Sequence, residues 1–316
     1  MSKVVLAKIT DLTHTQWLAM RQHGLGGSDA AAICRMSRWR GPLAVYTEKV
    51  SSYVVEEDNE AMYWGRVMEP VLLAEFGKRS GLKVEPVPYM FSCHEYPFML
   101  ADIDGIAHEQ DGSVSLVEIK TANAFAAPDW ENGLPQEYYI QIQHYLAVCD
   151  LPRAYVVVLI GGNNFRYERI ERDEETIKTI ISMEYAFWHE HVLAHVAPEA
   201  DATSGPALDA LYPASDNTSI ILPAEADQLI HHLDELKEAE NIVKAEKTQT
   251  ENQLKALVKG AECGKTPAGY SVKWKTSSTS RLDTTRLKAE QPDIVSKYTK
   301  TSSYRRFSVT APKTKG

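Results

Sequence analysis

The strongest constraint on the fold comes from one continuous apolar run, "AYVVVLIGG", at residues 154–162. No charged residue interrupts it, so a strand formed here needs a covering layer on both faces, which is typical of the middle of a sheet. The run stops at a Gly-Gly pair, which is a turn signal. Helical and strand patterns alternate on both sides of it. We therefore expect an α/β core that ends near residue 200.

Four segments follow one another along the chain. Residues 1–200 form the expected core, and residues 201–222 are rich in Ala, Pro, Ser and Asp, which predicts a linker. Residues 223–261 read as one long helical stretch, either an arm, a helical hairpin or a short coiled coil. Residues 262–316 form a small basic α+β unit. The helical stretch has a roughly heptad rhythm, carried by Leu229, Leu233, Leu236, Ala239, Val243, Leu254 and Leu257.

The net charge of −9 hides a marked asymmetry. Residues 262–316 hold 12 basic and 4 acidic side chains, while the rest of the chain has a net charge of −17. Five aromatic residues are interleaved with these basic residues, a composition that suits contact with a nucleic-acid backbone and its bases. A small β-unit with its own aromatic core would look the same. We expect a hairpin between 269–277 and 304–312, and the candidate DNA contacts are Lys273, Lys275, Arg281, Arg305 and Arg306.

The spacing of the cysteines and the hydropathy of the chain argue against several classes of protein. Cys34, Cys93, Cys149 and Cys263 lie far apart with no CxxC pair, which argues against a zinc ribbon or an iron–sulfur cluster. No apolar run approaches the length that crosses a bilayer, and the first residues lack the apolar stretch of a signal peptide. We expect a cytoplasmic protein without a membrane partner.

A carboxylate and a lysine interrupt the apolar segment "LVEIKTA", residues 116–122. Residues two apart on a strand share a face, so Glu118 and Lys120 would lie side by side. Upstream, "MLADIDGI" places Asp102 and Asp104 on one face of a preceding strand. Two adjacent antiparallel strands would then gather carboxylates and a lysine, which suits a hard divalent ion acting on a phosphodiester. A surface ion pair next to a turn would give the same short pattern.

Three further polar features favour the metal-dependent interpretation. The first is a Gly-rich turn with Arg21 and Ser28, which could hold a phosphate. The second is Glu69 on an apolar helix. The third is a polar helix face formed by Gln141, Gln143 and Tyr145. Backbone amides and a hydroxyl at a helix start suit a phosphate. An amide side chain can hold water or phosphate without competing for a metal, and Gln143 and Tyr145 are further candidate DNA contacts.

These motifs identify a resemblance to the lambda-type (YqaJ-like) viral recombinase exonucleases of the PD-(D/E)xK nuclease superfamily. "GLGGSDAAAI", "EAMYWGRVMEP", "LADIDGI", "LVEIKTA" and "PQEYYIQIQHYLAV" carry it, over roughly residues 14–195. The resemblance implies a restriction-endonuclease-like core with a central mixed sheet flanked by helices. It implies two Mg²⁺ ions, with Mn²⁺ as a substitute, and digestion of duplex DNA from a 5′ end that leaves a 3′ overhang for phage-type recombination. It also implies a toroidal trimer, a single-strand annealing partner, and a phage or prophage gene expressed in a bacterial host.

The resemblance assigns roles to residues of this sequence. It implies that the two ions are held by Asp104, Glu118, the carbonyl of Ile119 and Glu69. It implies that Lys120 and Gln141 act in catalysis and that Arg21 and Ser28 hold the terminal 5′-phosphate. Ile103 stands where the family has proline. Asp102 is the rival for the aspartate role, but Gly105 after Asp104 fits the family better.

Two alternatives stay open. An endonuclease or single-strand nuclease could use the same core, because a metal site does not encode dependence on DNA ends. A non-catalytic DNA-binding scaffold would rely on the basic segment instead.

Overall fold

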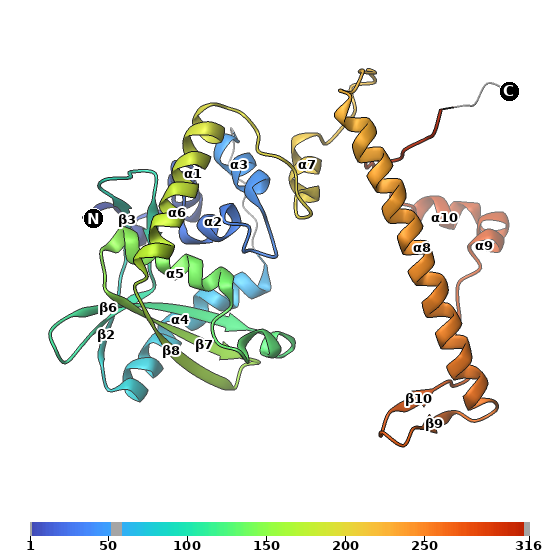
Figure 1. The fold of residues 1–316 in the computed structure, drawn as a ribbon, viewed down its shortest axis with the longest axis horizontal. Coiled ribbons are helices and arrows are strands. Elements are labelled where there is room, and N and C mark those ends of the chain that lie inside the picture. The colour runs from blue at the N-terminus through green and yellow to red at the C-terminus, as the bar shows by residue number, and fades with distance from the viewer. Residues whose placement is uncertain (1, 52–58, 313–316) are drawn as a thin grey trace. The chain divides into compact units, whose positions relative to one another are not determined.

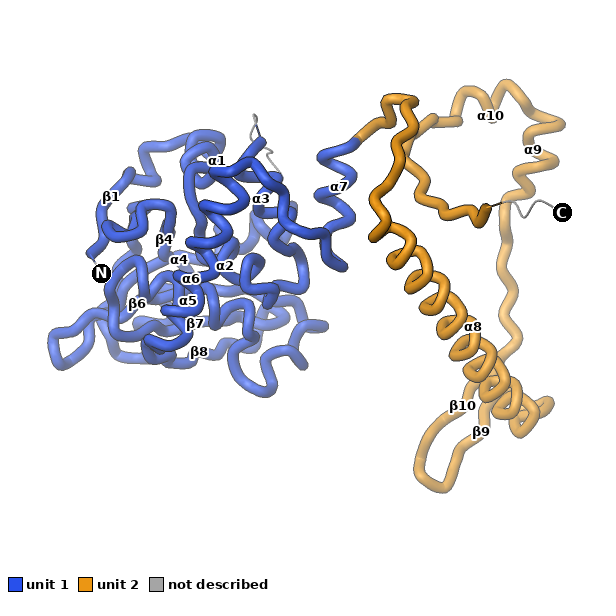
Figure 2. The backbone as a smooth tube through the Cα atoms, turned by 45° about the horizontal axis from the view of Figure 1, so that its top comes forward, with its two compact units in different colours: residues 1–212 blue, residues 213–316 orange. Residues whose placement is uncertain are grey.

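The computed structural model describes residues 2–51 and 59–312 (Figure 1). The chain forms two compact units, Met1–Tyr212 and Pro213–Gly316 (Figure 2).

Unit 1 contains the alternating helices and strands of an α/β core. In chain order these are β1 (Lys3–Lys8), η1 (Ile9–Asp11), α1 (His14–Gln22), α2 (Gly27–Ile33), α3 (Pro42–Val50), α4 (Glu60–Ser80), β2 (Lys83–Pro86), β3 (Tyr89–Cys93), β4 (Leu100–Asp102), β5 (Gly105–His108), β6 (Val114–Ala122), η2 (Ala124–Trp130), α5 (Gln136–Cys149), β7 (Arg153–Ile160), β8 (Asn164–Glu171), α6 (Glu174–Phe187), the π-helical turn η3 (Trp188–Leu193) and α7 (Gly205–Leu211).

A five-stranded mixed sheet is the centre of unit 1, in the order β2-β5-β6-β7-β8. β6 and β7 are parallel, and the other neighbouring pairs are antiparallel. The apolar run forms β7, an interior strand between β6 and β8, as its composition predicts. This confirms the expected α/β fold with a central mixed sheet and flanking helices.

Helices α4 and α5 cover the two faces of this sheet. Phe76 of α4 belongs to one core cluster with Val117 and Val157, whereas Leu146 of α5 belongs to another with Leu116. Leu116 and Val117 are successive residues of β6, so their side chains point to opposite faces. Both faces of the central strands are therefore buried, and the polar residues of β6 lie between two apolar layers.

The ends of α4 and α5 have local causes. Asn59 caps the start of α4 by accepting a hydrogen bond from the Met62 N–H at 3.0 Å. Gly81 ends it in the left-handed conformation, with φ of 74°, a role that glycine fills without a Cβ clash. Pro135 precedes α5, and Asp150 ends it with φ of 54°. Both helices are thus fixed in register against the sheet.

A second sheet, in the order β1-β3-β4, corrects one expectation. Asp102 and Asp104 do not share a strand. Asp102 ends β4 in the three-stranded sheet, and Asp104 immediately precedes β5 in the five-stranded one. Buried Ile103 lies between them, where the chain passes from one sheet to the other.

Unit 2 contains α8 (Glu225–Val258), β9 (Cys263–Lys265), β10 (Ser271–Lys273), α9 (Thr284–Glu290) and α10 (Pro292–Tyr298). The expected hairpin between 269–277 and 304–312 is wrong. β10 pairs with β9, which is much nearer in sequence, and residues 299–312 have no regular structure. Although α8 is long, none of the helices in the described part of the chain combines the length and apolarity needed to cross a membrane.

The boundary between the units lies after Tyr212, inside the segment expected to be a linker. Helix α7 occupies part of that segment and packs on α3. Ser204 and Ala207 are buried there. The Pro- and Ser-rich segment therefore includes a short packed helix before the end of unit 1.

Candidate active site

A polar pocket of about 190 Å³ opens in unit 1 where α1, α2, α4, α5 and β6 meet. It brings together most of the residues singled out from the sequence. Its lining consists of Trp17, Arg21, Gly26, Ser28, Glu69, Met90, Leu100, Ala101, Asp102, Asp104, Glu118, Ile119, Lys120, Gln141 and Tyr145.

The register between β5 and β6 sets the two central carboxylates. The strands are antiparallel, as expected, with Gly105 opposite Val117. Asp104 precedes Gly105 and therefore lies beside Glu118. Its Oδ2 accepts a hydrogen bond from the Ile119 N–H at 2.6 Å, so the carboxylate of one strand is tied to the backbone of the next.

Lys120 and Gln141 fix the carboxylate of Glu118. The Lys120 Nζ lies 2.6 Å from Glu118 Oε1, and the Gln141 Nε2 donates to the same oxygen at 2.9 Å. Gln141 also donates to the Tyr145 hydroxyl at 3.3 Å. Helix α5 thus supports β6 at the point where its charged pair interrupts the apolar core.

Burial and mutual repulsion raise the pKa values of these acidic groups. Burial and the neighbouring Glu118 raise the pKa of Asp104 well above its usual range. Burial also raises the pKa of Glu118, although Lys120 opposes the shift. Burial, Glu118 and Asp102 raise the pKa of Glu69 to about 7. For Lys120, burial opposes protonation, but the adjacent carboxylates outweigh it and raise its pKa.

The same group of oxygens fits a hard divalent cation. Glu118 Oε2 is buried and has no hydrogen-bond partner among the described residues, so a charged acceptor remains unused. Across residues 2–51 and 59–312, no set of three or more His, Cys, Asp and Glu side chains is gathered as ready-made metal ligands. Magnesium, however, is commonly bound through one or two carboxylates and several waters. Asp104 and Glu118 supply two carboxylates in one pocket, and Ile119 lines the same pocket.

A guanidinium and a hydroxyl also line this pocket. The Arg21 Nη2 donates to the Ser28 Oγ at 3.2 Å, and the guanidinium lies 4.9 Å from the centre of the Trp17 ring. The Trp17 indole N–H donates to Asp102 Oδ2 at 2.7 Å. A guanidinium and a hydroxyl therefore sit in the same pocket as the carboxylate centre.

Sequence reasoning missed the buried ion pairs that lie next to Arg21 and Gly26. Asp29 is fully buried and forms ion pairs with Arg40 and with Lys49, the latter at 2.8 Å. Burial alone would raise the pKa of Asp29, but the two cations hold it well below its usual range. The carboxylate also accepts from the Gly26 N–H at 2.9 Å, and Lys49 donates to the Arg21 carbonyl at 2.9 Å. No local signal links Asp29 to partners 11 and 20 residues away.

Gln143 and Tyr145, both proposed as DNA contacts, separate in the structure. Tyr145 lines the pocket. Gln143 is fully buried. Its Nε2 donates to the Glu171 carbonyl and its Oε1 accepts from the Asp173 N–H, each at 2.9 Å. These two hydrogen bonds connect Gln143 to the junction between β8 and α6. We therefore remove Gln143 from the DNA contacts and assign it a structural role.

The candidate DNA contacts of the basic segment belong to unit 2, whereas the pocket is lined by unit 1 alone. These residues are Lys273, Lys275, Arg281, Arg305 and Arg306. All five are exposed, and the Lys275 Nζ lies 3.6 Å from Glu262 Oε2.

Comparisons with known proteins show which family this chain resembles. Residues 16–152 match the family described as the YqaJ-like viral recombinase domain. The chain is 35% identical over 312 residues to the uncharacterized protein YqaJ of Bacillus subtilis (strain 168), covering 96% of this chain and 97% of that protein.

Among solved structures, the chain is similar to the alkaline exonuclease LHK-Exo from Laribacter hongkongensis, with 23% identity, coverage of 57% of this chain and 93% of that chain, and a TM-score of 0.48. LHK-Exo in complex with dAMP matches with 24% identity, the same coverages and a TM-score of 0.49. A phage-related exonuclease from Haemophilus somnus 129PT matches with 12% identity, coverage of 57% of this chain and 99% of that chain, and a TM-score of 0.41.

Proposed function

The chain belongs to the family of YqaJ-like viral recombinase domains, and from this premise we propose that it is a magnesium-dependent exonuclease that digests one strand of duplex DNA from a 5′ end. One observation carries the proposal. A single pocket joins the carboxylate and lysine centre of Asp104, Glu118 and Lys120 to the guanidinium and hydroxyl of Arg21 and Ser28. The first group suits hydrolysis of a phosphodiester, and the second suits a terminal phosphate.

The acidic residues would hold two Mg²⁺ ions, with Mn²⁺ as a substitute. Asp104, Glu118 and the Ile119 carbonyl are the ligands proposed for one ion, and Glu69 lies near the second. A bound divalent ion supplies an acidified water and polarises a phosphoryl oxygen. The chain's own contribution is to orient these oxygens, since Gln141 and Lys120 fix Glu118 and the Ile119 N–H fixes Asp104.

Lys120 has a second task in this proposal. Its ammonium is kept protonated by the carboxylates around it, which raise its pKa, so it can stabilise negative charge that develops on the scissile phosphate. It also approaches the Tyr138 ring, 5.2 Å from the ring centre, which limits its freedom on the side away from Glu118.

Arg21 and Ser28 give the proposed enzyme its dependence on ends. A guanidinium forms charge-assisted hydrogen bonds with phosphate oxygens. In the adjacent turn, the Asp29 carboxylate accepts a hydrogen bond from the Gly26 N–H. The products would be mononucleotides and a 3′ single-stranded overhang. By the family resemblance, we propose a toroidal trimer, an annealing protein as the recipient of the overhang, and action in the cytoplasm of a bacterial host.

Degradation of linear duplex DNA tests the function. Glu118→Gln and Asp104→Asn should each reduce turnover in Mg²⁺ at least ~1000-fold, because activation of water by a metal accounts for several kcal/mol of the barrier. EDTA should abolish the reaction, and duplex binding should persist. Glu75→Gln, on α4 but outside the pocket, is the matched control.

Two results would contradict the proposal. Retention of more than a tenth of the wild-type rate by either variant would remove the carboxylate centre from catalysis. Degradation of a closed circular duplex at the rate of the linear one would favour an endonuclease, and binding without any hydrolysis would favour a scaffold.

A further inference from the structure

Helix α8 presents an apolar stripe that unit 2 does not cover. The helix is 34 residues long, and within this fully described range only Val258, beside the β9–β10 hairpin, is buried. Large apolar side chains along the rest of the helix are exposed at seven-residue spacing. Leu229, Leu236, Val243 and Leu257 have exposed fractions of 71%, 53%, 64% and 79%.

The stripe has the two positions of a coiled-coil seam. We assign this seven-residue series to heptad position d, which then also includes Thr250. Position a is then occupied by Leu233, Glu240, Lys247 and Leu254. The seam is apolar toward both ends and polar in the middle. A repeat of this kind is buried against a second helix.

We propose that α8 pairs with α8 of a second copy of this chain, which belongs to another ring of the proposed trimer, in an antiparallel two-stranded coiled coil centred on Ala245. The charges at position a decide the orientation. A parallel pair would place Glu240 against the partner's Glu240 and Lys247 against the partner's Lys247. Like charges directly opposed at an interface are unfavourable.

The antiparallel arrangement makes the same helix self-complementary. Leucine meets leucine at both ends, and the polar residues meet near the centre, where Glu240 comes within reach of the partner's Lys247. Flanking the seam, Lys244 faces the partner's Glu251. The resulting layers pair Leu233 with the partner's Leu257, Leu236 with the partner's Leu254, Glu240 with the partner's Thr250, and Val243 with the partner's Lys247.

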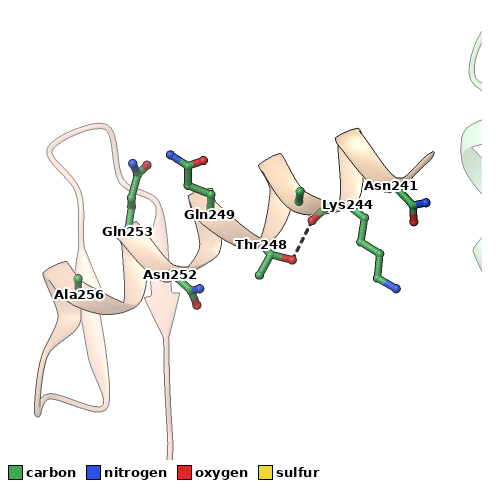
Figure 3. Close-up of a pocket in the computed structure, with 8 residues that line it drawn as sticks. Asn241, Lys244, Thr248, Gln249, Asn252, Gln253 and Ala256 are labelled. Atoms are coloured by element: carbon green, nitrogen blue, oxygen red, sulfur yellow. Dashed lines mark hydrogen bonds between the residues drawn. The ribbon is translucent and has the colours of Figure 1, made fainter. Parts of the chain in front are cut away.

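The residues outside the seam are mostly polar, with Ile242 as an exposed apolar exception. Figure 3 shows the side chains of this polar face along the helix, mostly amides and small residues, with the Thr248 hydroxyl donating to the Lys244 carbonyl at 2.8 Å. These are Asn241, Lys244, Ala245, Thr248, Gln249, Asn252, Gln253 and Ala256. Apart from Lys244 and Gln253 beside the seam, this face remains in water while the leucine stripe is covered.

Disulfide cross-linking of the full-length chain tests both the contact and its direction. Exposed Cys263 is first replaced by serine. Mixing differently tagged Leu236→Cys and Leu254→Cys chains under mild oxidation should give a mixed disulfide at least roughly tenfold faster than either gives with itself, because disulfides require Cα atoms within about 7 Å. Gln249→Cys, on the polar face, is the control and should not cross-link.

A charge exchange provides the second measurement. Lys247→Glu should raise the dissociation constant of the pair about tenfold, because it opposes like charges across the seam, and light scattering over a dilution series measures this. Glu240→Lys with Lys247→Glu should restore it, because the exchange preserves the antiparallel contacts. In a parallel pair, like charges would oppose each other in all three proteins.

The helix content of each variant, measured by circular dichroism, should stay unchanged, as should the DNA degradation rate, since the pocket lies in unit 1. Self-linking of Leu236→Cys would overturn the antiparallel pair. Absence of intermolecular linking, with unchanged mass in every variant, would overturn the pairing and assign the stripe to another part of the same chain.

Discussion

His144 and Glu184 form an ion pair that is buried without any exposure to solvent, in the core behind the pocket. The His144 Nδ1 lies 2.8 Å from Glu184 Oε1, and its Nε2 lies 2.8 Å from the Leu100 carbonyl oxygen. A carbonyl can only accept, so Nε2 carries a proton. Burial would lower the pKa of His144, but the Glu184 carboxylate outweighs it and raises that pKa above the usual value. The pair therefore stabilises the fold in its protonated form.

This pair predicts a pH dependence of stability. A histidine whose pKa is raised by folding contributes fully below its unfolded pKa of about 6.5, and the contribution is lost as pH rises through the folded pKa. Burial also raises the pKa of Glu184, which acts in the same direction. Urea unfolding between about pH 6 and 9 should therefore show stability falling with pH. His144→Gln should remove part of this slope and cost about 3–5 kcal/mol.

Exposed His94 provides the control for that experiment, and His94→Gln should retain both the stability and the slope. Identical slopes for wild type and His144→Gln would show that the pair does not titrate in this range.

Arg21 predicts a preference for phosphorylated ends. Removing a guanidinium that binds a phosphate costs about 1.5–3 kcal/mol, so Arg21→Ala should slow digestion of 5′-phosphorylated duplexes roughly 10- to 150-fold. Digestion of 5′-hydroxyl ends should change far less. Arg79→Ala, on the exposed side of α4, is the control. Equal losses on both kinds of end would exclude Arg21 from a phosphate pocket.

At the scale of elements, Gly27 allows α2 to pack directly on α5. A Cβ added there would lie 2.6 Å from Gln141 Cγ and 2.8 Å from Tyr145 Cε1. Gly27→Ala should therefore displace Gln141 from Glu118 and cost about 1–3 kcal/mol through overpacking. Thermal unfolding and the degradation rate should both fall. Gly205→Ala, with open space around it, should change neither. Wild-type activity in Gly27→Ala would show that Gln141 does not depend on this contact.

The elements that were predicted well are those with long apolar segments. β6, β7, α4 and α5 each contain such a segment, and the pair of Glu118 and Lys120 follows from the two-residue period of a strand. The break at Ile103 has no local signal, because sheet membership depends on which distant strand supplies hydrogen bonds. The ion pair of Asp29 and Lys49 was not predictable for the same reason, since α3 brings the lysine there. At 304–312, an alternating pattern without a partner strand gave a false hairpin.

At the scale of the whole molecule, the two units differ in charge and in core. The basic segment of unit 2 is exposed and leaves its aromatic residues uncovered, including Tyr304 and Phe307 at 81% and 82%. We expect truncation after Gly260 to weaken DNA binding at moderate salt. Each phosphate that the shortened protein no longer neutralises should reduce the slope of log affinity against log salt by about one.

Affinity at several salt concentrations, with mass measured on the same samples, checks this prediction. The rate on saturating DNA should change little, because the pocket residues lie in unit 1. A truncated protein with an unchanged salt slope but an altered mass would assign the segment to assembly instead of DNA binding.

The hydrogen bond from the Ile119 N–H to Asp104 has a consequence for engineering. The spacing of the two carboxylates depends on how β5 aligns with β6 and is independent of the length of chain that joins the strands. The connecting turn at Asp111 and Gly112 is exposed, and Gly112 has open space around it. This turn is therefore an insertion point: a peptide tag or a fluorophore-binding loop placed there should leave the chemistry intact, whereas one residue added within either strand would rotate a ligand to the wrong face.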